Sequence, residues 1–336
     1  MKKKGILLIN TGSPSAPTTK EVRKYLSQFL MDPYMLDMPF WKRWLLVHGI
    51  ILRTRPKHSA RLYKEIWTPR GSPLIVISEE QRSSLSEQTG LPAALGFRYG
   101  TPTINEGLNA LLGQGCDTII GFPLFPQYSL AATESVLVQL EADSRRASRP
   151  HKLEIIPPFW NHPAYLNAWI ESVKKNLPPD TDHLLVSFHG LPERHIRKAD
   201  PTGHTCLKNP DCCQNASGEV LERCYRAQTL RMTQSLVQAL GLKEDQYTLC
   251  YQSRLGRDPW LSPHTLETAT RLAHSGVRHL TVVAPSFVSD CLETLHEIQI
   301  EIKDAFLESG GKEFTYLPCL NESTEWMSQI VSEIEA

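Results

Sequence analysis

Four short runs of aliphatic and β-branched residues, each followed by a longer stretch with helical spacing, constrain the fold of this chain most strongly. The runs cover residues 5–9, 118–122, 184–188 and 280–284. Continuous apolar runs of this length are typical of parallel strands buried on both faces. The stretches with helical spacing include residues 20–29 and 290–307. The alternation predicts repeated βαβ units and an α/β fold.

The length of the chain favours two domains. A chain of 336 residues can bury two separate cores, and the segment PPFWNH at 157–162 is the expected division. We expect two Rossmann-like lobes, each a parallel sheet flanked by helices. The first covers residues 1–157 and is rejoined by a C-terminal helix at 322–336, and the second covers residues 158–321.

Charge and motif content argue against several classes of function. Lys plus Arg equals Asp plus Glu at 36 each, so no net field attracts nucleic acid. Neither GxGxxG nor GxxxxGK[ST] occurs, which disfavours a nucleotide-binding enzyme. The apolar run at 6–9 is too short for a signal-peptide core, and no apolar stretch reaches the roughly 20 residues of a membrane span. We expect a cytoplasmic protein.

Ligands of open parallel sheets bind beyond the carboxyl ends of the strands. The segments that follow the four runs are 10–14, 123–129, 189–192 and 285–287, and they carry two sets of aromatic side chains and one histidine. His189 is interpreted as the first residue after its strand, held at the edge of the sheet by the turn at 190–192. A purely structural role for this lone histidine is an equal alternative.

A row of acidic residues follows the fourth run. They fall at 290, 293, 297, 301, 304 and 308, in steps that place them on one stripe of a helix. A solvated acidic face is the commoner outcome for such a stripe. The first three, Asp290, Glu293 and Glu297, lie where the ligand site is expected, and carboxylates there can guide a dication or accept protons.

Four of the eight cysteines crowd into nineteen residues with the spacing C-x5-CC-x10-C. These are Cys206, Cys212, Cys213 and Cys224. The spacing lacks the paired CxxC knuckles of common zinc sites, but four thiolates suit either zinc or an iron–sulfur cluster. The other four cysteines are scattered and are expected to be buried small hydrophobes.

The segment 29–52 is rich in methionine and aromatic side chains. Such clusters are usually core, but Pro33 and Pro39 interrupt regular structure here. We expect part of this segment to form an exposed lip for a flat apolar ligand or for a lipid surface, which would make the protein peripherally membrane-associated.

Six segments together resemble the ferrochelatases over nearly the whole chain. They are LINTGSP (8–14), FRYGTP (97–102), PLFPQYS (123–129), SFHGLP (187–192), QSRLGRDPWL (252–261) and PSFVSDCLETLHEI (285–298). The resemblance implies two lobes with a porphyrin cleft between them. It also implies a lyase-class metal chelatase of haem biosynthesis that inserts Fe(II) into protoporphyrin IX or coproporphyrin III with release of two protons.

The resemblance also assigns site residues. It makes His189 the acceptor of pyrrole protons, Glu293 and Glu297 with Asp290 a path for protons or metal, and His189 with Glu293 the contacts of Fe(II). The substrate-binding residues that it implies are Asn10, Arg98, Tyr99, Tyr128, Ser129, Trp260 and Phe287. Where eukaryotic members have a second histidine beside the acidic helix, this chain has Cys291, with His296 one turn further on.

The clustered cysteines are similar to the internal segment by which some bacterial ferrochelatases hold a [2Fe-2S] cluster. We therefore expect Cys206, Cys212, Cys213 and Cys224 to bind such a cluster in preference to zinc. Two other functions stay open at this point. One is a cobalt chelatase acting on another tetrapyrrole, and the other is a haem-binding carrier without catalysis.

Overall fold

The computed structural model describes residues 3–147, 149–256 and 258–335. Arg257, part of the segment 252–261, and the extreme ends of the expected first lobe lie outside the described residues. The chain divides into two compact units. Unit 1 comprises Met1–Phe125, Leu130–Pro158 and Asn321–Ala336, and unit 2 comprises Pro126–Ser129 and Phe159–Leu320.

Unit 1 is built on a parallel sheet of four strands in the order β2-β1-β3-β4. The strands are β1 (Lys4–Asn10), β2 (Ala93–Phe97), β3 (Thr118–Pro123) and β4 (Lys152–Ile155). The central strand β1 pairs with β2 through Ile9 and Gly96 and with β3 through Ile9 and Pro123. Its side chains from Ile6 to Ile9 are fully buried, because helices cover both faces of the sheet.

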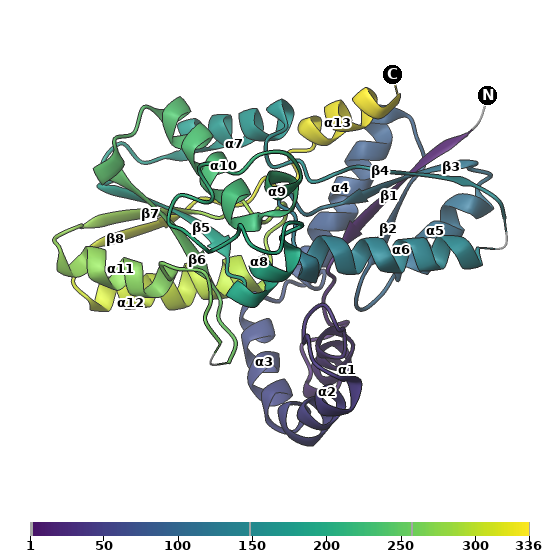
Figure 1. The fold of residues 1–336 in the computed structure, drawn as a ribbon, viewed down its shortest axis with the longest axis horizontal. Coiled ribbons are helices and arrows are strands. Elements are labelled where there is room, and N and C mark those ends of the chain that lie inside the picture. Colours follow the sequence, from purple (N-terminus) through teal and green to yellow (C-terminus); the bar gives the residue numbers. More distant parts are fainter. Residues whose placement is uncertain (1–2, 148, 257, 336) are drawn as a thin grey trace. The chain divides into compact units, whose positions relative to one another are not determined.

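Helices on both faces close the core of unit 1. Figure 1 shows α4 (Pro73–Thr89) and α13 (Glu325–Glu335) on one side of this sheet and α5 (Ile104–Gly113) and α6 (Ser135–Arg146) on the other. The π-helix η2 (Leu130–Glu134) leads into α6. A further group projects from the sheet and consists of α1 (Thr19–Leu30), α2 (Phe40–Leu46), the π-helix η1 (Val47–Ile51) and α3 (Leu52–Ile66).

Unit 2 repeats the arrangement with a parallel sheet in the order β6-β5-β7-β8. The strands are β5 (His183–His189), β6 (Tyr247–Gln252), β7 (His279–Val283) and β8 (Glu313–Tyr316). His189 is the last residue of β5 and pairs with Gln252, the last residue of β6. The two sheets flanked by helices confirm the expected α/β fold class.

Long helices also cover both faces of the unit 2 sheet. α7 (Pro163–Asn176) and α10 (Tyr225–Leu240) lie on one face, and α11 (Thr265–His274), η4 (Glu293–Ile302) and α12 (Lys303–Glu308) lie on the other (Figure 1). Leu185, Val282 and Ile298 meet in the core of that second face. The short elements α8 (Glu193–Ala199), α9 (Gly218–Arg223) and η3 (Glu244–Gln246) complete the unit.

Two sequence interpretations need correction. His189 was expected just after its strand, but β5 extends to include it, because its backbone continues the ladder to Gln252. The segment 290–307 was expected to be one regular helix. It consists instead of a ten-residue π-helix, η4, followed by α12. The backbone that carries Glu293 and Glu297 is therefore wound more widely than an α-helix.

The segment 29–52 exposes several large apolar side chains on α2 and η1. Their exposed fractions are 65% for Phe40, 61% for Trp41, 48% for Trp44, 54% for Leu45 and 63% for Ile50. Apolar side chains exposed together in one segment are a candidate contact surface. Within the described part of the chain, no helix combines the length and apolar character that a membrane span requires.

Candidate active site

His189 stands at the carboxyl edge of the unit 2 sheet, held through its main chain. Its backbone N–H donates to Oγ of Ser286 at 3.0 Å, and its carbonyl accepts from the hydroxyl of Tyr225 at 2.8 Å. The Ser286 bond ties β5 to the loop that follows β7, and the Tyr225 bond ties it to the start of α10. The backbone at position 189 is therefore fixed independently of the imidazole.

The ring of His189 is oriented by a contact within its own turn. Nδ1 lies 2.7 Å from the carbonyl oxygen of Gly190, so Nδ1–H donates to it and Nε2 keeps the lone pair. The ring of Phe287 meets the imidazole edge to face, with centroids 6.2 Å apart and an interplanar angle of 68°. The half-buried His189 can thus accept a proton at Nε2.

Glu297 lies next to this histidine and is anchored by Ser253. Its Oε1 accepts from the backbone N–H of Ser253 at 2.6 Å, and its Oε2 accepts from the hydroxyl of the same residue. Burial raises the pKa of Glu297 above its ordinary value, and the Ser253 hydroxyl and the nearby His189 partly oppose this rise. A carboxyl group with a raised pKa beside an imidazole is suited to passing protons on.

Glu293 begins the π-helix and lies close enough to raise the pKa of Glu297 further by charge repulsion. Gln252 fixes this turn, because its Nε2 donates to the carbonyl of Glu293 at 2.7 Å and reaches Oε2 of Glu297 at 3.4 Å. Cys291 is buried, which raises the pKa of its thiol, and the thiol hydrogen-bonds to the Glu293 side chain. Glu293 and His189 both interact electrostatically with Glu297, and we call these three residues the His189 group.

Asp290 is oriented differently from the other two acids. It is 4% exposed, and its Oδ1 accepts from Thr294 Oγ1 at 2.7 Å and from the Tyr316 hydroxyl at 2.6 Å. Further along the helix, Nδ1 of the buried His296 pairs with Oε1 of Glu301 at 3.4 Å. The described contacts make Asp290 an anchor for the start of the helical segment.

Trp260 lies against the turn that orients His189. It forms an isolated bridge with Pro192, and its indole N–H donates to the carbonyl of Leu255 at 3.1 Å. A Cβ atom on Gly190 would lie 3.3 Å from Cε3 of Trp260 and 2.8 Å from the carbonyl oxygen of Gln252. Only glycine fits there without displacing backbone, so this turn and the indole are packed together.

Tyr128 and Ser129 are nearly buried in unit 2. The backbone N–H of Tyr128 donates to Oε1 of Gln228 at 2.7 Å, and Arg223 donates to the tyrosine hydroxyl at 3.0 Å. The guanidinium of Arg223 also lies over the ring, 5.4 Å from its centroid. Sequence reasoning missed Arg223, since α9 carries no motif that identifies a partner for an aromatic residue upstream.

In unit 1, Arg98 and Tyr99 converge on a buried carboxylate that sequence reasoning missed. Asp32 Oδ2 lies 2.5 Å from Nη2 of Arg98 and accepts from the Tyr99 hydroxyl at 2.9 Å and from Ser135 Oγ at 2.6 Å. Arg98 also donates from Nε to Ser135 at 2.8 Å. The side chains of Arg98 and Tyr99 are therefore fixed in place before any ligand binds.

Asn10 ends β1 at the carboxyl edge of the unit 1 sheet. Its carbonyl accepts from the backbone N–H of Arg98 at 2.9 Å, and its Oδ1 accepts from the N–H of Thr11 at 2.7 Å. A cavity of about 490 Å³ is lined by residues that include Asp32, Arg98 and Tyr99.

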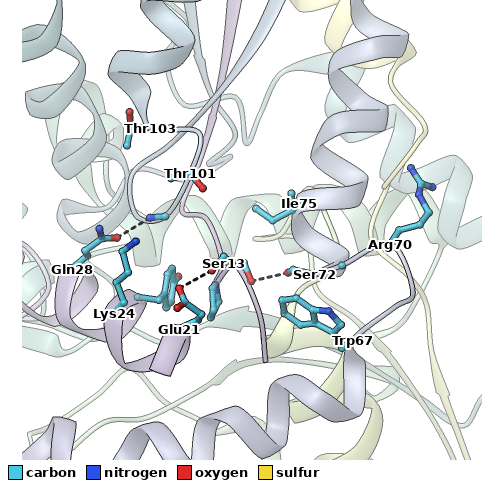
Figure 2. A pocket seen from close by; sticks show the side chains of 15 residues that line it. Ser13, Glu21, Lys24, Gln28, Trp67, Arg70, Ser72, Ile75, Thr101 and Thr103 are labelled. Carbon is cyan, nitrogen blue, oxygen red and sulfur yellow. Dashed lines mark hydrogen bonds between the residues drawn. The ribbon is translucent and has the colours of Figure 1, made fainter. Parts of the chain in front are cut away.

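A second cavity of about 250 Å³ lies beyond the segment 13–15 (Figure 2). Ser72 donates to Ser13 there at 2.7 Å, and Lys24 and Arg70 are among the lining residues. Both cavities lie in unit 1, so neither includes His189 or Glu297. We rank the His189 group first as the reaction site, because its proton acceptor and its carboxylates lie at the carboxyl edge of the unit 2 sheet, where ligands of open parallel sheets bind.

The four clustered cysteines are all buried, with 2 to 6% of each side chain exposed. Hydrogen bonds from Cys206 and Cys213 hold the pKa of the Cys224 thiol well below its ordinary value, and Cys212 Sγ lies 3.9 Å from Cys213 Sγ. All four thiols are thus linked by neighbour contacts.

Asp200 organises the loop that carries Cys206. It accepts the backbone N–H groups of Thr205 and Cys206, each at 2.7 Å, and the Thr202 hydroxyl at 2.7 Å. Burial acts to raise the pKa of Asp200, but these hydrogen bonds outweigh it and hold the pKa at about 2. The carboxylate therefore stays ionised at neutral pH and joins three residues of the loop.

A family model described as Ferrochelatase matches residues 3–336. The chain is 44% identical to the ferrochelatase of Stutzerimonas stutzeri (strain A1501) over 336 residues, covering 98% of this chain and 97% of that protein. It is also 44% identical to the ferrochelatase of Azotobacter vinelandii (strain DJ / ATCC BAA-1303) over 326 residues, covering 97% and 96%.

Among solved structures, the fold is similar to SirB from Bacillus subtilis with Fe3+. The TM-score is 0.52 at 14% identity, covering 99% of this chain and 96% of that chain. A sirohydrochlorin chelatase SirB from Bacillus subtilis subspecies spizizenii in complex with cobalt gives a TM-score of 0.50 at 12% identity, covering 98% and 94%. At these identities the likeness concerns the fold alone.

Proposed function

The chain belongs to the ferrochelatase family and is a metal chelatase, and we propose that it inserts Fe(II) into protoporphyrin IX or coproporphyrin III at the group around His189. One observation carries this proposal. The Nδ1–H of His189 is held by Gly190, which leaves Nε2 to accept a proton, and the carboxyl group of Glu297, with its raised pKa, lies beside it.

Metal insertion exchanges two N–H protons of the macrocycle for one Fe(II) ion. In the proposed reaction Nε2 of His189 takes each pyrrole proton in turn and passes it to Glu297, and the proton then leaves to solvent by way of Glu293. His189 and Glu293 are the proposed contacts of Fe(II) before it enters the ring. The raised pKa of Glu297 supports the relay, because a carboxylate that protonates more readily accepts a proton from an imidazolium more readily.

Aromatic side chains are proposed to hold the macrocycle while this occurs. A planar porphyrin hides its nitrogen lone pairs, so bending the ring toward the transition state favours insertion. Trp260 and Phe287 flank His189 in unit 2, and Tyr128 is stiffened by Arg223. The remaining residues proposed to contact substrate are Asn10, Arg98, Tyr99 and Ser129.

Asp290 is proposed to position Glu293 rather than to transfer protons, because its carboxylate is buried and hydrogen-bonded to Thr294 and Tyr316.

The function is tested by an anaerobic assay with purified protein. Protoporphyrin IX and coproporphyrin III are each mixed with Fe(II), Co(II) or Zn(II), and metalloporphyrin formation is followed by absorbance. We expect turnover with Fe(II) and a preference for one of the two porphyrins. Porphyrin binding without turnover would instead indicate a carrier, and turnover confined to Co(II) would indicate a cobalt chelatase.

We further infer that Cys206, Cys212, Cys213 and Cys224 hold a [2Fe-2S] cluster. Cys206 and Cys213 each hydrogen-bond to the thiol of Cys224, and Cys212 Sγ lies 3.9 Å from Cys213 Sγ, so the four residues form two close pairs. A two-iron cluster takes two thiolates on each iron, so close pairs suffice. Such a cluster supplies one-electron redox chemistry and holds the loop 200–224 together.

The proposed cluster can be tested independently of chelatase activity, by the iron and sulfide content of the protein. Anaerobically purified protein should be red-brown and contain two iron and two labile sulfide per chain, as [2Fe-2S] implies. Cys224→Ser should lose both, because Cys224 contacts two of the other thiols. Cys116→Ala, which changes a buried cysteine in unit 1, should retain them. Wild-type protein without labile sulfide would rule the cluster out.

We also infer that the exposed patch on α2 and η1 contacts a membrane surface, with the protein otherwise in the cytoplasm. Exposed basic residues lie on α2 and follow the patch in sequence along α3, and Nζ of Lys42 lies over the Trp41 ring. These basic residues are Lys42, Arg53, Arg55, Lys57, Arg61 and Lys64. Apolar side chains that insert between headgroups and cations that face anionic lipids bind membranes jointly.

Vesicle binding tests this surface. Phe40→Ser with Trp41→Ser should weaken binding to anionic vesicles by at least about tenfold, because each buried aromatic contributes roughly 1.5–3 kcal/mol. Co-sedimentation with phosphatidylglycerol-containing vesicles measures the effect. The control, Val138→Ser with Leu266→Ser, removes exposed apolar side chains elsewhere. Equal binding by both double variants would exclude the patch as the contact.

A further inference from the structure

Three side chains of types that can ligate a metal converge at the amino edge of the unit 2 sheet, the edge opposite His189. Nδ1 of His279 lies 3.3 Å from Oδ2 of Asp180 and 3.7 Å from Oε2 of Glu313. The three atoms lie within 4.8 Å of one another. They come from the loop before β5 and from the first residues of β7 and β8.

The register of the sheet creates this group. His279 and Glu313 are direct partners in the parallel pair of β7 and β8, so their side chains share one face with Thr315, two residues further on. The loop with Asp180 is fastened beside them, because Asp182 N–H donates to the His279 carbonyl at 3.0 Å and Asp182 Oδ2 accepts from His279 N–H at 2.9 Å. The three donors are therefore held together by backbone structure.

The imidazole of His279 provides a second, independent observation. It is 6% exposed, yet Nδ1 has no hydrogen-bond partner among the described atoms. Its Nε2 lies 2.9 Å from Thr315 Oγ1, and in the tautomer that donates from Nε2–H the Nδ1 lone pair faces two carboxylates. A buried lone pair beside two anions is unfavourable unless a cation lies among them.

We propose that His279, Asp180 and Glu313 form a binding site for a divalent transition-metal ion, completed by water. Ligands 2.0–2.2 Å from a tetrahedral metal are about 3.3–3.6 Å apart, close to the separations of 3.3 and 3.7 Å found here. Imidazole with carboxylates suits Zn(II), Fe(II) or Co(II) better than it suits Ca(II). The carboxylates are 66% and 65% exposed, which gives an ion direct access.

This site is separate from the proposed reaction site. His279 begins β7, and its neighbour β5 runs seven residues from His183 to His189. At about 3.3 Å per residue the two edges are roughly 20 Å apart, too far for an ion at His279 to contact a ring at His189. The ion would instead join the loop at 177–182 to β7 and β8 and stabilise the amino edge of the sheet.

The test uses the full chain after removal of metals by a chelator. Zn(II) is added to wild type and to Asp180→Asn/Glu313→Gln, with ion stoichiometry measured by calorimetry and hydrogen exchange measured at 279–283 and 313–316. We expect the double variant to bind one ion fewer per chain and to lose the Zn(II)-dependent protection of both strands. Asp304→Asn/Glu308→Gln, which neutralises two exposed acids on α12, should behave like wild type.

A finer variant separates metal binding from simple charge pairing. Thr315→Val keeps all three ligands but removes the partner of Nε2, and it should weaken Zn(II) binding at this site about 10–100-fold. If His279 is an imidazolium paired with both carboxylates, Zn(II) will leave exchange in β7 and β8 unchanged. That result, or equal stoichiometry in wild type and the first double variant, would overturn the proposal.

Discussion

His189→Ala should lower the rate of haem formation from Fe(II) and porphyrin by about 10²–10⁴-fold, the range that a positioned general base contributes. The reason is that Nε2 of His189 is the proposed first acceptor of the pyrrole protons. The fold should survive, because Ser286 and Tyr225 bind the main chain at position 189 rather than the ring. Porphyrin affinity should change little, since Trp260 and Phe287 are retained.

Steady-state kinetics and porphyrin fluorescence quenching separate these effects. The expected pattern is a fall in kcat with a porphyrin Kd close to that of wild type. His274→Ala, which removes an exposed histidine at the end of α11, serves as the matched control and should keep full activity. Turnover of the His189 variant at the wild-type rate would remove the histidine from the mechanism and leave Glu297 as the first acceptor to examine.

The four strands expected from sequence are confirmed, and they are the inner strands of the two sheets. β1, β3, β5 and β7 are buried on both faces, so their sequences read as unbroken apolar runs. The edge strands β2, β4, β6 and β8 were missed. KLEI in β4 and EFTY in β8 are short and partly exposed, and such segments carry no apolar signal that separates them from loops.

In the site, too, features within one segment could be predicted from sequence, whereas contacts between residues distant in sequence could not. The spacing of Glu293 and Glu297 predicts that they lie on one stripe, because both belong to one helical segment. Their partner Ser253 could not, since it lies 44 residues from Glu297 and is brought to it by the pairing of β6 with β5. Asp32, the partner of Arg98 and Tyr99, lies 66 residues from Arg98 and was missed for the same reason.

Asp290 shows that helical spacing alone does not predict which contacts a side chain makes. Spacing grouped it with Glu293 and Glu297, but the described contacts turn its carboxylate to Thr294 and Tyr316. Tyr316 ends β8, so this contact depends on the tertiary arrangement of the sheet. The π-helix was equally invisible to sequence reasoning, because the apolar spacing of 292–306 is compatible with an ordinary helix.

Glu297→Gln should lower kcat by about 10²-fold or more, the lower end of the contribution of a proton-transfer group. Glutamine can keep both contacts with Ser253, accepting from the backbone N–H and donating to the hydroxyl. It cannot carry a proton from His189 to solvent, so the loss should appear in kcat. Asp304→Asn, on the exposed continuation of the stripe, is the matched control and should retain activity.

The same variant should change how stability depends on pH. Burial raises the pKa of Glu297 in the folded protein, so the folded state holds its proton over a range where the unfolded chain has released it. Stability from this group is therefore full below the ordinary value of 4.5 and falls as the pH rises through the raised pKa. Glutamine removes that fall, because it does not ionise, and thermal denaturation of Glu297→Gln should show a flatter profile than wild type above this pH. If Glu297→Gln keeps the wild-type dependence of stability on pH, the pKa of Glu297 is not raised in the fold, and if it also keeps wild-type turnover, its part as the second proton acceptor is wrong.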